Sequence, residues 1–362
     1  LSQLKSQCQG IVCCLGLLFS LAGDAFAIET FLPEGQSAII VHSEYVVDTT
    51  MSQEIDVIRQ QGNENNWLAL KEDYANFGYQ PFPYWYRFTI SNPGSKQINQ
   101  ILEISYPLLD TVDYYEFKGN RLIKEVHTGD RVAYSERPIE HPYFLFPVEL
   151  QAKEKHVIYL RVMTKGSQLV PIKLWEGTKL FVDLAKEDSL QAVYLGFVAV
   201  IIFFNLLIFI ALREKMYLYY AIAAFLYMLF FSIMRAKLYP YIFSDSPAFH
   251  HTLLLLLPSS CLLFSALFSR EFLKPKNYSK YLDYLINGLI AIAYFGLLGV
   301  FIFDSQFSLK LSVFSAIPGS FMLFLLGPIL GFMGNRMAWV YAAAWGTFMC
   351  GATITALSKQ GY

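Results

Sequence analysis

The chain has 362 residues, of which 55% are hydrophobic and 17% aromatic, while only 16% are charged. Ordinary soluble domains carry charge on about a quarter of their residues, so this composition is typical of a protein with large membrane-embedded parts. The formal net charge is -1, which leaves no basic excess for a nucleic-acid-binding face and excludes nucleic acid as a partner.

The charged residues lie mostly before about residue 190, where long apolar segments begin, and this shift predicts a domain boundary. The cysteines all lie outside the polar part of the first half, at Cys8, Cys13, Cys14, Cys261 and Cys350. This distribution excludes a disulfide framework or a cysteine-based metal site in that polar part.

Residues 1–27 predict a secretory signal peptide. Lys5 lies in a polar lead, an apolar core follows over residues 11–22, and the sequence AFA at residues 25–27 offers small residues at the cleavage position. The alternative is an uncleaved anchor helix, but the apolar core is shorter than the roughly 20 residues of a membrane span. We therefore expect the chain from residue 28 onward to be exported.

Residues 28–183 predict an exported domain rich in strands. Turn sequences such as SNPGS and KGN separate short segments of aromatic and β-branched residues. These segments cover residues 84–90, 100–106, 113–117, 143–150, 156–162 and 171–176. Their spacing favours an all-β sandwich. A short helix is expected within residues 49–61, where Thr50 and Gln53 can form a capping box.

Alternation along two of these strands places an aromatic ring beside an arginine on the face away from the apolar core. Trp85 and Arg87 share that face in one strand, and Tyr159 and Arg161 share it in another. An arginine fork beside a flat ring suits a sugar, a carboxylate or a phosphate. The alternative is that Trp85 is simply buried and that the arginines pair with acidic side chains. The four residues converge on a ligand only if the two strands lie in one sheet.

The second half predicts an all-α polytopic membrane bundle over residues 190–358. Its apolar segments are free of charged residues and are each long enough to cross a bilayer, which takes roughly 20 residues. The predicted spans are residues 190–212, 216–234, 252–269, 284–303, 311–335 and 337–358. The sequence LREK at residues 212–215 is then a hairpin, and the tyrosines after it belong to the interfacial aromatic belt.

The loop charges predict the orientation of these spans. Loops on the side opposite the exported domain contain Arg213, Lys215, Arg270, Lys274, Lys276, Lys280 and Arg336. The outer connections hold only Arg235, Lys237, Lys310 and Lys359. The positive-inside rule therefore predicts a multi-pass protein of the bacterial inner membrane with its N-terminal domain in the periplasm. An even number of spans would return Tyr362 to the outside, so we expect a seventh span to be missing from the C-terminal end.

The polar content of the spans argues against several activities. No Asp, Glu, Lys, Arg or His lies deep in a span, and Asn205 and Asn287 are the main polar residues there. Pumps and coupled carriers usually need ionisable groups at mid-membrane. His250 and His251 are adjacent and face different sides of a helix, which makes them poor joint metal ligands. No catalytic triad, HExxH or phosphate-binding glycine loop stands out, so we expect no enzymatic activity, cofactor or metal.

Small residues in the last two spans predict close helix packing. Gly327 and Gly331 form a GxxxG pattern, and Ala342, Gly346 and Cys350 repeat small residues at the same spacing. Such patterns occur in membrane proteins of every kind, so they support a helical bundle and not a particular function.

Several segments resemble the bacterial seven-transmembrane receptors with diverse intracellular signalling modules. Residues 194–231 look like the first helix pair of that family, with matching positions at Asn205, Arg213 and the tyrosines that follow. Residues 268–288 are similar to its third inner loop, and residues 336–362 resemble its sixth helix and the start of the following loop.

The exported half resembles the second type of extracellular domain in the same family, a jelly-roll-like sandwich. The matching positions are residues 84–88, Asn92, residues 107–110, residues 129–130, residues 137–138 and residues 160–161. The resemblance implies a carbohydrate-like ligand and adds Asp110 to the predicted ligand-binding residues Trp85, Arg87, Tyr159 and Arg161. The seventh helix and the cytoplasmic output module of the family have no counterpart in this sequence.

Two functions follow from these expectations. In the first, the chain is a sensory receptor whose periplasmic domain binds a small-molecule or carbohydrate ligand, and whose helices pass the signal to an output module outside this chain. The expected partners are this ligand, the lipid bilayer, and a second copy of the chain or a partner signalling protein. In the second, the chain is a non-signalling envelope protein, either a glycan-binding anchor or a transporter accessory. A kinase or cyclase activity belongs, by the resemblance, to the missing C-terminal module.

Overall fold

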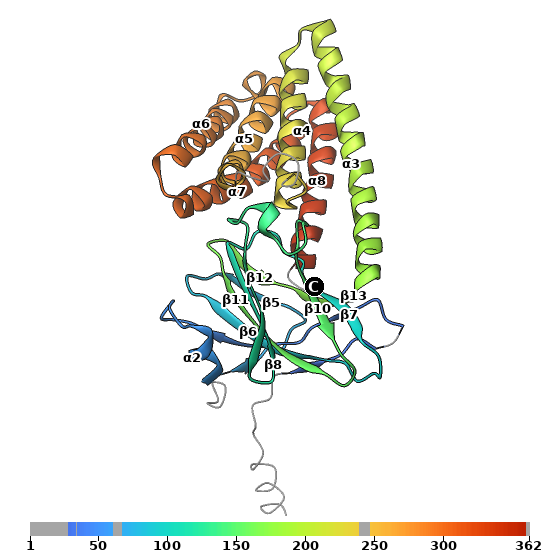
Figure 1. Ribbon diagram of the computed structural model, residues 1–362. Coiled ribbons are helices and arrows are strands. Elements are labelled where there is room, and N and C mark those ends of the chain that lie inside the picture. The colour runs from blue at the N-terminus through green and yellow to red at the C-terminus, as the bar shows by residue number, and fades with distance from the viewer. Residues whose placement is uncertain (1–27, 34, 61–66, 239–246, 360–362) are drawn as a thin grey trace, which may run out of the picture.

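The computed structural model describes residues 28–33, 35–60, 67–238 and 247–359. A β-sandwich lies at one end of the molecule, and a bundle of long helices lies at the other (Figure 1). The predicted fold class, an all-β sandwich followed by an all-α membrane bundle, is confirmed. The predicted signal peptide, residues 1–27, lies outside the described residues.

The sandwich is built from two antiparallel sheets that face each other across an apolar core. The large sheet has the strand order β4-β3-β6-β11-β8-β9, with β1 (Glu29–Thr30) added to β6 in parallel. Its strands are β3 (Glu44–Val47), β4 (Leu68–Ala69), β6 (Tyr84–Ser91), β8 (Thr111–Lys118), β9 (Arg121–Thr128) and β11 (Lys155–Met163). The small sheet has the order β10-β7-β13-β2. Its strands are β2 (Ala38–Ile40), β7 (Ile98–Ile104), β10 (Phe144–Leu150) and β13 (Ile172–Glu176). A separate ribbon pairs β5 (Ala75–Tyr79) with β12 (Ser167–Val170).

The core between the sheets is formed by the alternating apolar residues of both. Tyr86 and Phe88 of β6 and Leu160 of β11 meet Leu102 of β7 and Phe146 of β10, and all five are buried. Because side chains alternate along a strand, this arrangement leaves the other face of β6 and β11 outside the core. The apolar faces predicted for these two strands are therefore confirmed.

Each predicted strand segment is a strand in the structure, but several strands were not predicted. The main omission is β9 (Arg121–Thr128), which forms the edge of the large sheet beside β8. Its residues are mostly exposed or half-buried. A strand at an edge needs no apolar face of its own, so its sequence carries little of the alternation that identifies an internal strand.

The short helix expected within residues 49–61 is α2 (Ile55–Gln60). The capping box predicted there is wrong in its detail. The backbone N–H of Gln53 donates to Oδ2 of Asp48, 3.1 Å away, and Asp48 Oδ1 accepts from the backbone N–H and the hydroxyl of Thr50. A carboxylate accepts such bonds more strongly than a hydroxyl, so Asp48 satisfies these donors ahead of the helix.

A long helix overlaps each predicted span. These helices are α3 (Gly177–Leu212), α4 (Lys215–Met234), α5 (Pro247–Leu273), α6 (Lys280–Ile302), α7 (Ser305–Phe332) and α8 (Arg336–Lys359). Helices α6 and α7 end at Ile302 and Phe332, before the predicted ends at residues 303 and 335. Within the described residues, the helices long and apolar enough to cross a membrane number five, from α3 to α7. A membrane crossing by α8 stays a prediction.

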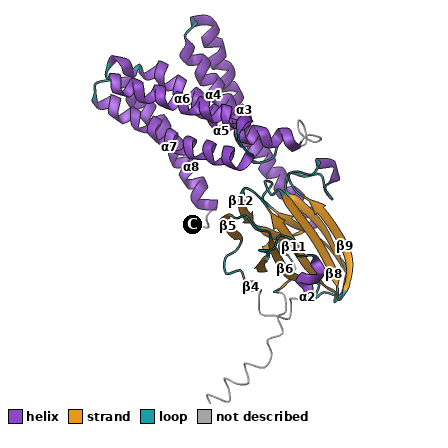
Figure 2. Ribbon diagram, turned by 90° about the vertical axis from the view of Figure 1, so that its left-hand side faces the viewer, coloured by secondary structure: helices purple, strands orange, loops and turns teal. Residues whose placement is uncertain are grey.

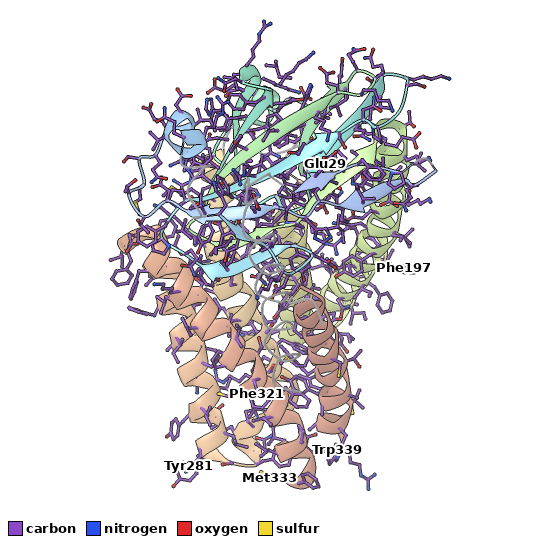
Figure 3. The ribbon with its side chains drawn as sticks, turned by 90° about the horizontal axis from the view of Figure 1, so that it is seen from below. Glu29, Phe197, Tyr281, Phe321, Met333 and Trp339 are labelled. Carbon is purple, nitrogen blue, oxygen red and sulfur yellow. The ribbon has the colours of Figure 1, made fainter. Side chains whose placement is uncertain are left out.

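Helix α3 begins at Gly177, well before the span predicted at residues 190–212. The additional residues are rich in charge and follow β13 without a loop, so α3 connects the sandwich directly to the bundle (Figure 1). Tyr281 and Met333, which lie beside the α5–α6 and α7–α8 connections, are at the end of the bundle far from the sandwich (Figure 3).

Helices α7 and α8 pack through the predicted glycine pattern. A Cβ atom on Gly327 would lie 2.8 Å from the Cβ of Ala342, and one on Gly331 would lie 2.7 Å from the ring of Trp339. The packing role predicted for the GxxxG pattern is therefore confirmed. The same two helices also share a hydrogen bond, in which the Tyr341 hydroxyl of α8 donates to the carbonyl oxygen of Leu323 of α7 at 3.1 Å.

Candidate functional site

The predicted aromatic and arginine residues do converge. Strands β6 and β11 are antiparallel neighbours in the large sheet, and their register places Trp85 opposite Arg161 and Arg87 opposite Tyr159. The condition that the two strands share a sheet is met. The four side chains lie on the face of the sheet away from the sandwich core, as the alternation predicted.

That face is covered rather than open. Helix α2 lies against it (Figure 2), and Ile58 of α2 packs in a small apolar cluster with Trp85, Tyr115 and Tyr159. The exposed fraction of Trp85 is only 1%. The face is therefore a second small core of the sandwich, closed by α2 and by Trp67.

Both arginines on this face have acidic partners. The Nε and Nη2 atoms of Arg87 donate to Oε2 of Glu44 at 3.0 and 2.6 Å, and its guanidinium lies 4.4 Å from the ring centroid of Trp67. Arg161 Nη1 donates to Oδ2 of Asp113 at 3.2 Å. These contacts correspond to the alternative in which Trp85 is buried and the arginines pair with acids. A ligand-binding role for the four residues stays a prediction.

Asp110 lies apart from the other predicted ligand-binding residues, at the end of the sandwich that faces the helices. Its Oδ1 atom accepts from Nε of Arg131 at 2.6 Å, and its Oδ2 atom accepts from the backbone N–H of Lys165. A Cβ atom on Gly129 would lie 2.1 Å from the carbonyl oxygen of Asp110, so only glycine fits there. Asp110 therefore organises the chain where the sandwich meets the bundle.

A cavity of about 200 Å³ lies at this junction, and we refer to it as the junction cavity. One wall comes from the sandwich and carries polar residues. Those residues are Tyr79, Tyr106, Asp110, Asp130, Thr164, Lys165 and Ser167. The other wall comes from α4, α5 and α7 and is apolar apart from one histidine. It consists of Phe230, Met234, His251, Leu254, Leu255, Pro258 and Leu309.

The sandwich wall has an unusual titrating group. Burial, helped by the neighbouring carboxylate of Asp110, raises the pKa of Asp130 to about 7. Burial likewise raises the pKa of Tyr106 to about 12. Asp130 therefore changes charge near neutral pH, while Tyr106 keeps its proton at any physiological pH.

A loop between β9 and β10 inserts a side chain into the helices. We call residues 129–143 the coupling loop. Tyr134, in a short 3₁₀ turn of this loop, is only 6% exposed and packs with Ile233 and Ala236 at the end of α4 and with Leu257 of α5. Arg137 holds the loop in shape, because its Nη1 atom donates to the carbonyl oxygens of His141 and Pro142 at 2.8 Å.

The polar start of α3 makes a second connection. Leu180 and Leu184 pack on Leu145 and Trp175 of the small sheet. One turn later, Glu187 accepts a hydrogen bond from the Tyr143 hydroxyl and another from Nη1 of Arg235, both at 3.3 Å, and Asp188 pairs with Lys237. The sandwich, α3 and the end of α4 are thus joined by one polar cluster.

Sequence reasoning missed both connections. Tyr134 lies in the polar segment RVAYSERPIEHP, where nothing marks one tyrosine as a packing residue. Only the positions at residues 129–130 and 137–138, which match the receptor family, pointed to this loop. Among the described residues, no three His, Cys, Asp or Glu side chains are grouped as ligands for a metal ion.

Two family models match this chain. Residues 41–176 match the model described as 7TMR-DISM extracellular 2, and residues 187–362 match the model described as 7TM diverse intracellular signalling. Together the matches cover most of the sandwich and all of the helical bundle except the first residues of α3. No curated protein matches the sequence closely enough to count as a relative.

Solved structures show only distant likeness. A cycloisomaltooligosaccharide glucanotransferase from Paenibacillus sp., complexed with cycloisomaltoheptaose, is 10% identical over 40% of this chain and 18% of its own, with a TM-score of 0.20. TmCBM61 in complex with β-1,4-galactotriose is 8% identical over 37% of this chain and 88% of its own, also with a TM-score of 0.20. Scores this low support no conclusion about fold or ligand.

Proposed function

Since the chain belongs to the family of seven-transmembrane receptors with diverse intracellular signalling modules, whose members are membrane receptors with an extracellular sensor domain, we propose that its sandwich binds a small, carbohydrate-like ligand. The helical bundle reports that binding across the membrane to a cytoplasmic output module. The sandwich lies in the periplasm and the bundle in the inner membrane, in agreement with the basic residues of the α3–α4, α5–α6 and α7–α8 connections.

The observation that carries the signalling part is the packing of Tyr134 between α4 and α5. The coupling loop joins β9 of the large sheet to β10 of the small sheet. A ligand that changes how the two sheets lie on each other therefore moves both ends of this loop. Because Tyr134 is packed between α4 and α5, such a movement changes the free energy of the helix arrangement.

The predicted residues Trp85, Arg87, Tyr159 and Arg161 supply the ligand chemistry in this proposal, because rings and guanidinium groups suit a sugar. A ligand reaches them only when α2 and Trp67 move away, since both cover this face. Opening of that cover is then the first event of binding. Asp110 acts elsewhere, at the domain junction.

A distance measurement tests the signalling proposal. The purified chain in lipid nanodiscs is first screened on a glycan array. Spin labels are then placed at Glu214→Cys and Met333→Cys, at the far end of the bundle, with exposed Cys350 changed to Ser. We expect the bound glycan to shift the distance between the labels. In Tyr134→Ala the glycan should still bind, but the shift should fall by at least half.

Tyr281→Ala is the matched control, because Tyr281 is an exposed aromatic residue remote from the sandwich. The control should keep the full shift. If the wild-type chain binds glycan without a change in the label distance, the result would instead favour the non-signalling anchor. If the shift is unchanged in Tyr134→Ala, the coupling loop does not transmit the signal.

A further inference from the structure

The junction cavity adjoins the cluster around Tyr134, and Phe230 and Leu254 belong to both, but Tyr134 itself does not line the cavity. Its wall on the bundle side is made of Phe230, Met234, Leu254, Leu255, Pro258 and Leu309, with His251 as the one polar side chain. Its wall on the sandwich side supplies the carboxylates, hydroxyls and Lys165. A molecule that fills such a space must be apolar over most of its surface and polar at one end.

The volume limits the size of that molecule. An apolar protein cavity of about 150 Å³ is known to hold one benzene molecule. At about 200 Å³, the junction cavity has room for a single ring with a short side chain and one small polar group. A full lipid or an oligosaccharide is too large.

His251 identifies where the polar group would lie. Its Nε2 atom is buried and has no hydrogen-bond partner among the described residues. A buried polar atom without a partner loses roughly 1–3 kcal/mol of solvation. A ligand atom that can bond to this nitrogen recovers that loss. A hydroxyl can do so whichever ring nitrogen carries the proton, because it both donates and accepts.

The surrounding charges favour a neutral group. Two carboxylates, Asp110 and Asp130, lie near two cations, Lys165 and Arg131. Arg131 is bound to Asp110 at 2.6 Å, so that carboxylate is already compensated. Acidic and basic side chains are thus interleaved at this end of the sandwich, and neither a row of carboxylates nor a row of cations is available to select a charged ligand.

We propose that the junction cavity binds a small, uncharged, hydroxyl-bearing apolar molecule of the size of a monocyclic phenol. The ring lies between Phe230, Leu254 and Leu255, and the hydroxyl bonds to Nε2 of His251. This site is distinct from the carbohydrate-like site of the proposed function. Binding at this site does not depend on the proposed receptor function. Its consequence for signalling does rest on that function, because a ligand that contacts both domains would stabilise one arrangement of the sandwich on the bundle.

Methionine NMR tests the proposal on the full chain in nanodiscs. The methyl group of Met234 lines the cavity, whereas Met337 lies on the exposed surface of α8. The chain is labelled with [methyl-¹³C]methionine, the Met234 signal is assigned with Met234→Leu, and 4-ethylphenol is titrated in. We expect a saturable shift of the Met234 signal. Met337 should show only the linear change that comes from partitioning of the phenol into lipid.

Variants and a second probe make the result specific. Leu255→Trp fills the cavity and should abolish the saturable shift, while Leu298→Trp, on the exposed surface of α6, should keep it. His251→Phe should weaken 4-ethylphenol binding at least tenfold, and 4-ethyltoluene, which lacks the hydroxyl, should bind the wild type at least tenfold more weakly.

A linear Met234 shift, or a saturable shift that survives Leu255→Trp, would overturn the site. Equal affinity for 4-ethyltoluene and 4-ethylphenol would overturn the assigned chemistry. Neither result bears on glycan binding or on the spin-label distances, so failure here is distinguishable from failure of the proposed receptor function.

Discussion

Arg87 lies between two partners that together account for its burial. Glu44 accepts two of its hydrogen bonds, and Trp67 covers its guanidinium, so that only 4% of the side chain is exposed. Removing one partner of a buried ion pair leaves the other charge uncompensated. The side chain therefore contributes to the stability of the sandwich whether or not it also contacts a ligand.

We expect Arg87→Ala to lower the free energy of unfolding of the sandwich by about 3 kcal/mol, because the carboxylate of Glu44 is left without its partner. Denaturation followed by tryptophan fluorescence, with no ligand present, measures this change. Arg121→Ala, at an exposed position of β9, should change it by less than about 0.5 kcal/mol. A stable Arg87→Ala variant that has lost glycan binding would instead establish the binding role predicted from the sequence.

Asp130 makes stability depend on pH. Its pKa is raised from 3.8 to about 7, with burial as the main cause, so the folded chain holds this proton over a range in which the unfolded chain has released it. The free energy of unfolding therefore falls as pH rises from about 4 to about 7 and then levels off. One pKa unit corresponds to about 1.4 kcal/mol, so between pH 5 and the raised pKa we expect a loss of about 2–3 kcal/mol from this group.

Asp130→Asn should remove that loss. The free energy of unfolding is measured for the wild type and for Asp130→Asn at pH 5 and at pH 8. The change in this free energy between the two pH values should be smaller in the variant. Other groups, such as His156, titrate in both chains and cancel in the comparison. Equal pH dependence in the two chains would show that Asp130 titrates in its ordinary range.

Alternation along β6 and β11 was enough to place Trp85, Arg87, Tyr159 and Arg161 on one face, because side-chain direction is a property of the strand itself. The cover over that face was not predictable, since α2 and Trp67 come from segments with no link to these strands in the sequence. Asp110 shows the same limit. Its position at the junction depends on how the bundle packs on the sandwich, and this packing cannot be predicted from the sequence around Asp110.

At the scale of elements, α7 and α8 approach each other closely at Gly327. Gly327→Val places a methyl-bearing carbon where the Cα of Ala342 lies 2.9 Å away, so the two helices must separate. We expect a loss of about 1–3 kcal/mol, the usual cost of overpacking, measured as a lower midpoint of unfolding in detergent. Gly288→Val on α6 is the control, because nothing lies within 4 Å of a Cβ atom there. Similar losses in both variants would point to helix propensity as the cause.

The long elements were predictable and their ends were not. Apolar length identified the membrane helices, since a span needs about 20 such residues. It gave no sign that α3 continues back to Gly177, because residues 177–189 are polar on one side and pack through Leu180 and Leu184 on the other. That early start is what ties the sandwich to the bundle.

At the scale of the whole molecule, the sandwich and the basic connections lie at opposite ends. Figure 3 shows Glu29 in the sandwich, with Tyr281 and Met333 at the far end of the helices. The connections at that far end carry Arg213, Lys215, Arg270, Lys274, Lys276, Lys280 and Arg336. The connections near the sandwich are poorer in Lys and Arg, so the charge distribution and the geometry agree with a periplasmic sandwich.

Reporter fusions and proteolysis test this orientation. A fusion after Arg213 or Lys276 should be active only in the cytoplasm, because both residues lie in connections remote from the sandwich. A fusion after Lys310, near the sandwich end of α7, should behave in the opposite way. In spheroplasts, external protease should cut within residues 28–183 and leave the far connections intact. Protection of the sandwich in intact spheroplasts, together with cleavage at the far connections, would reverse the proposed topology and with it the direction of signalling.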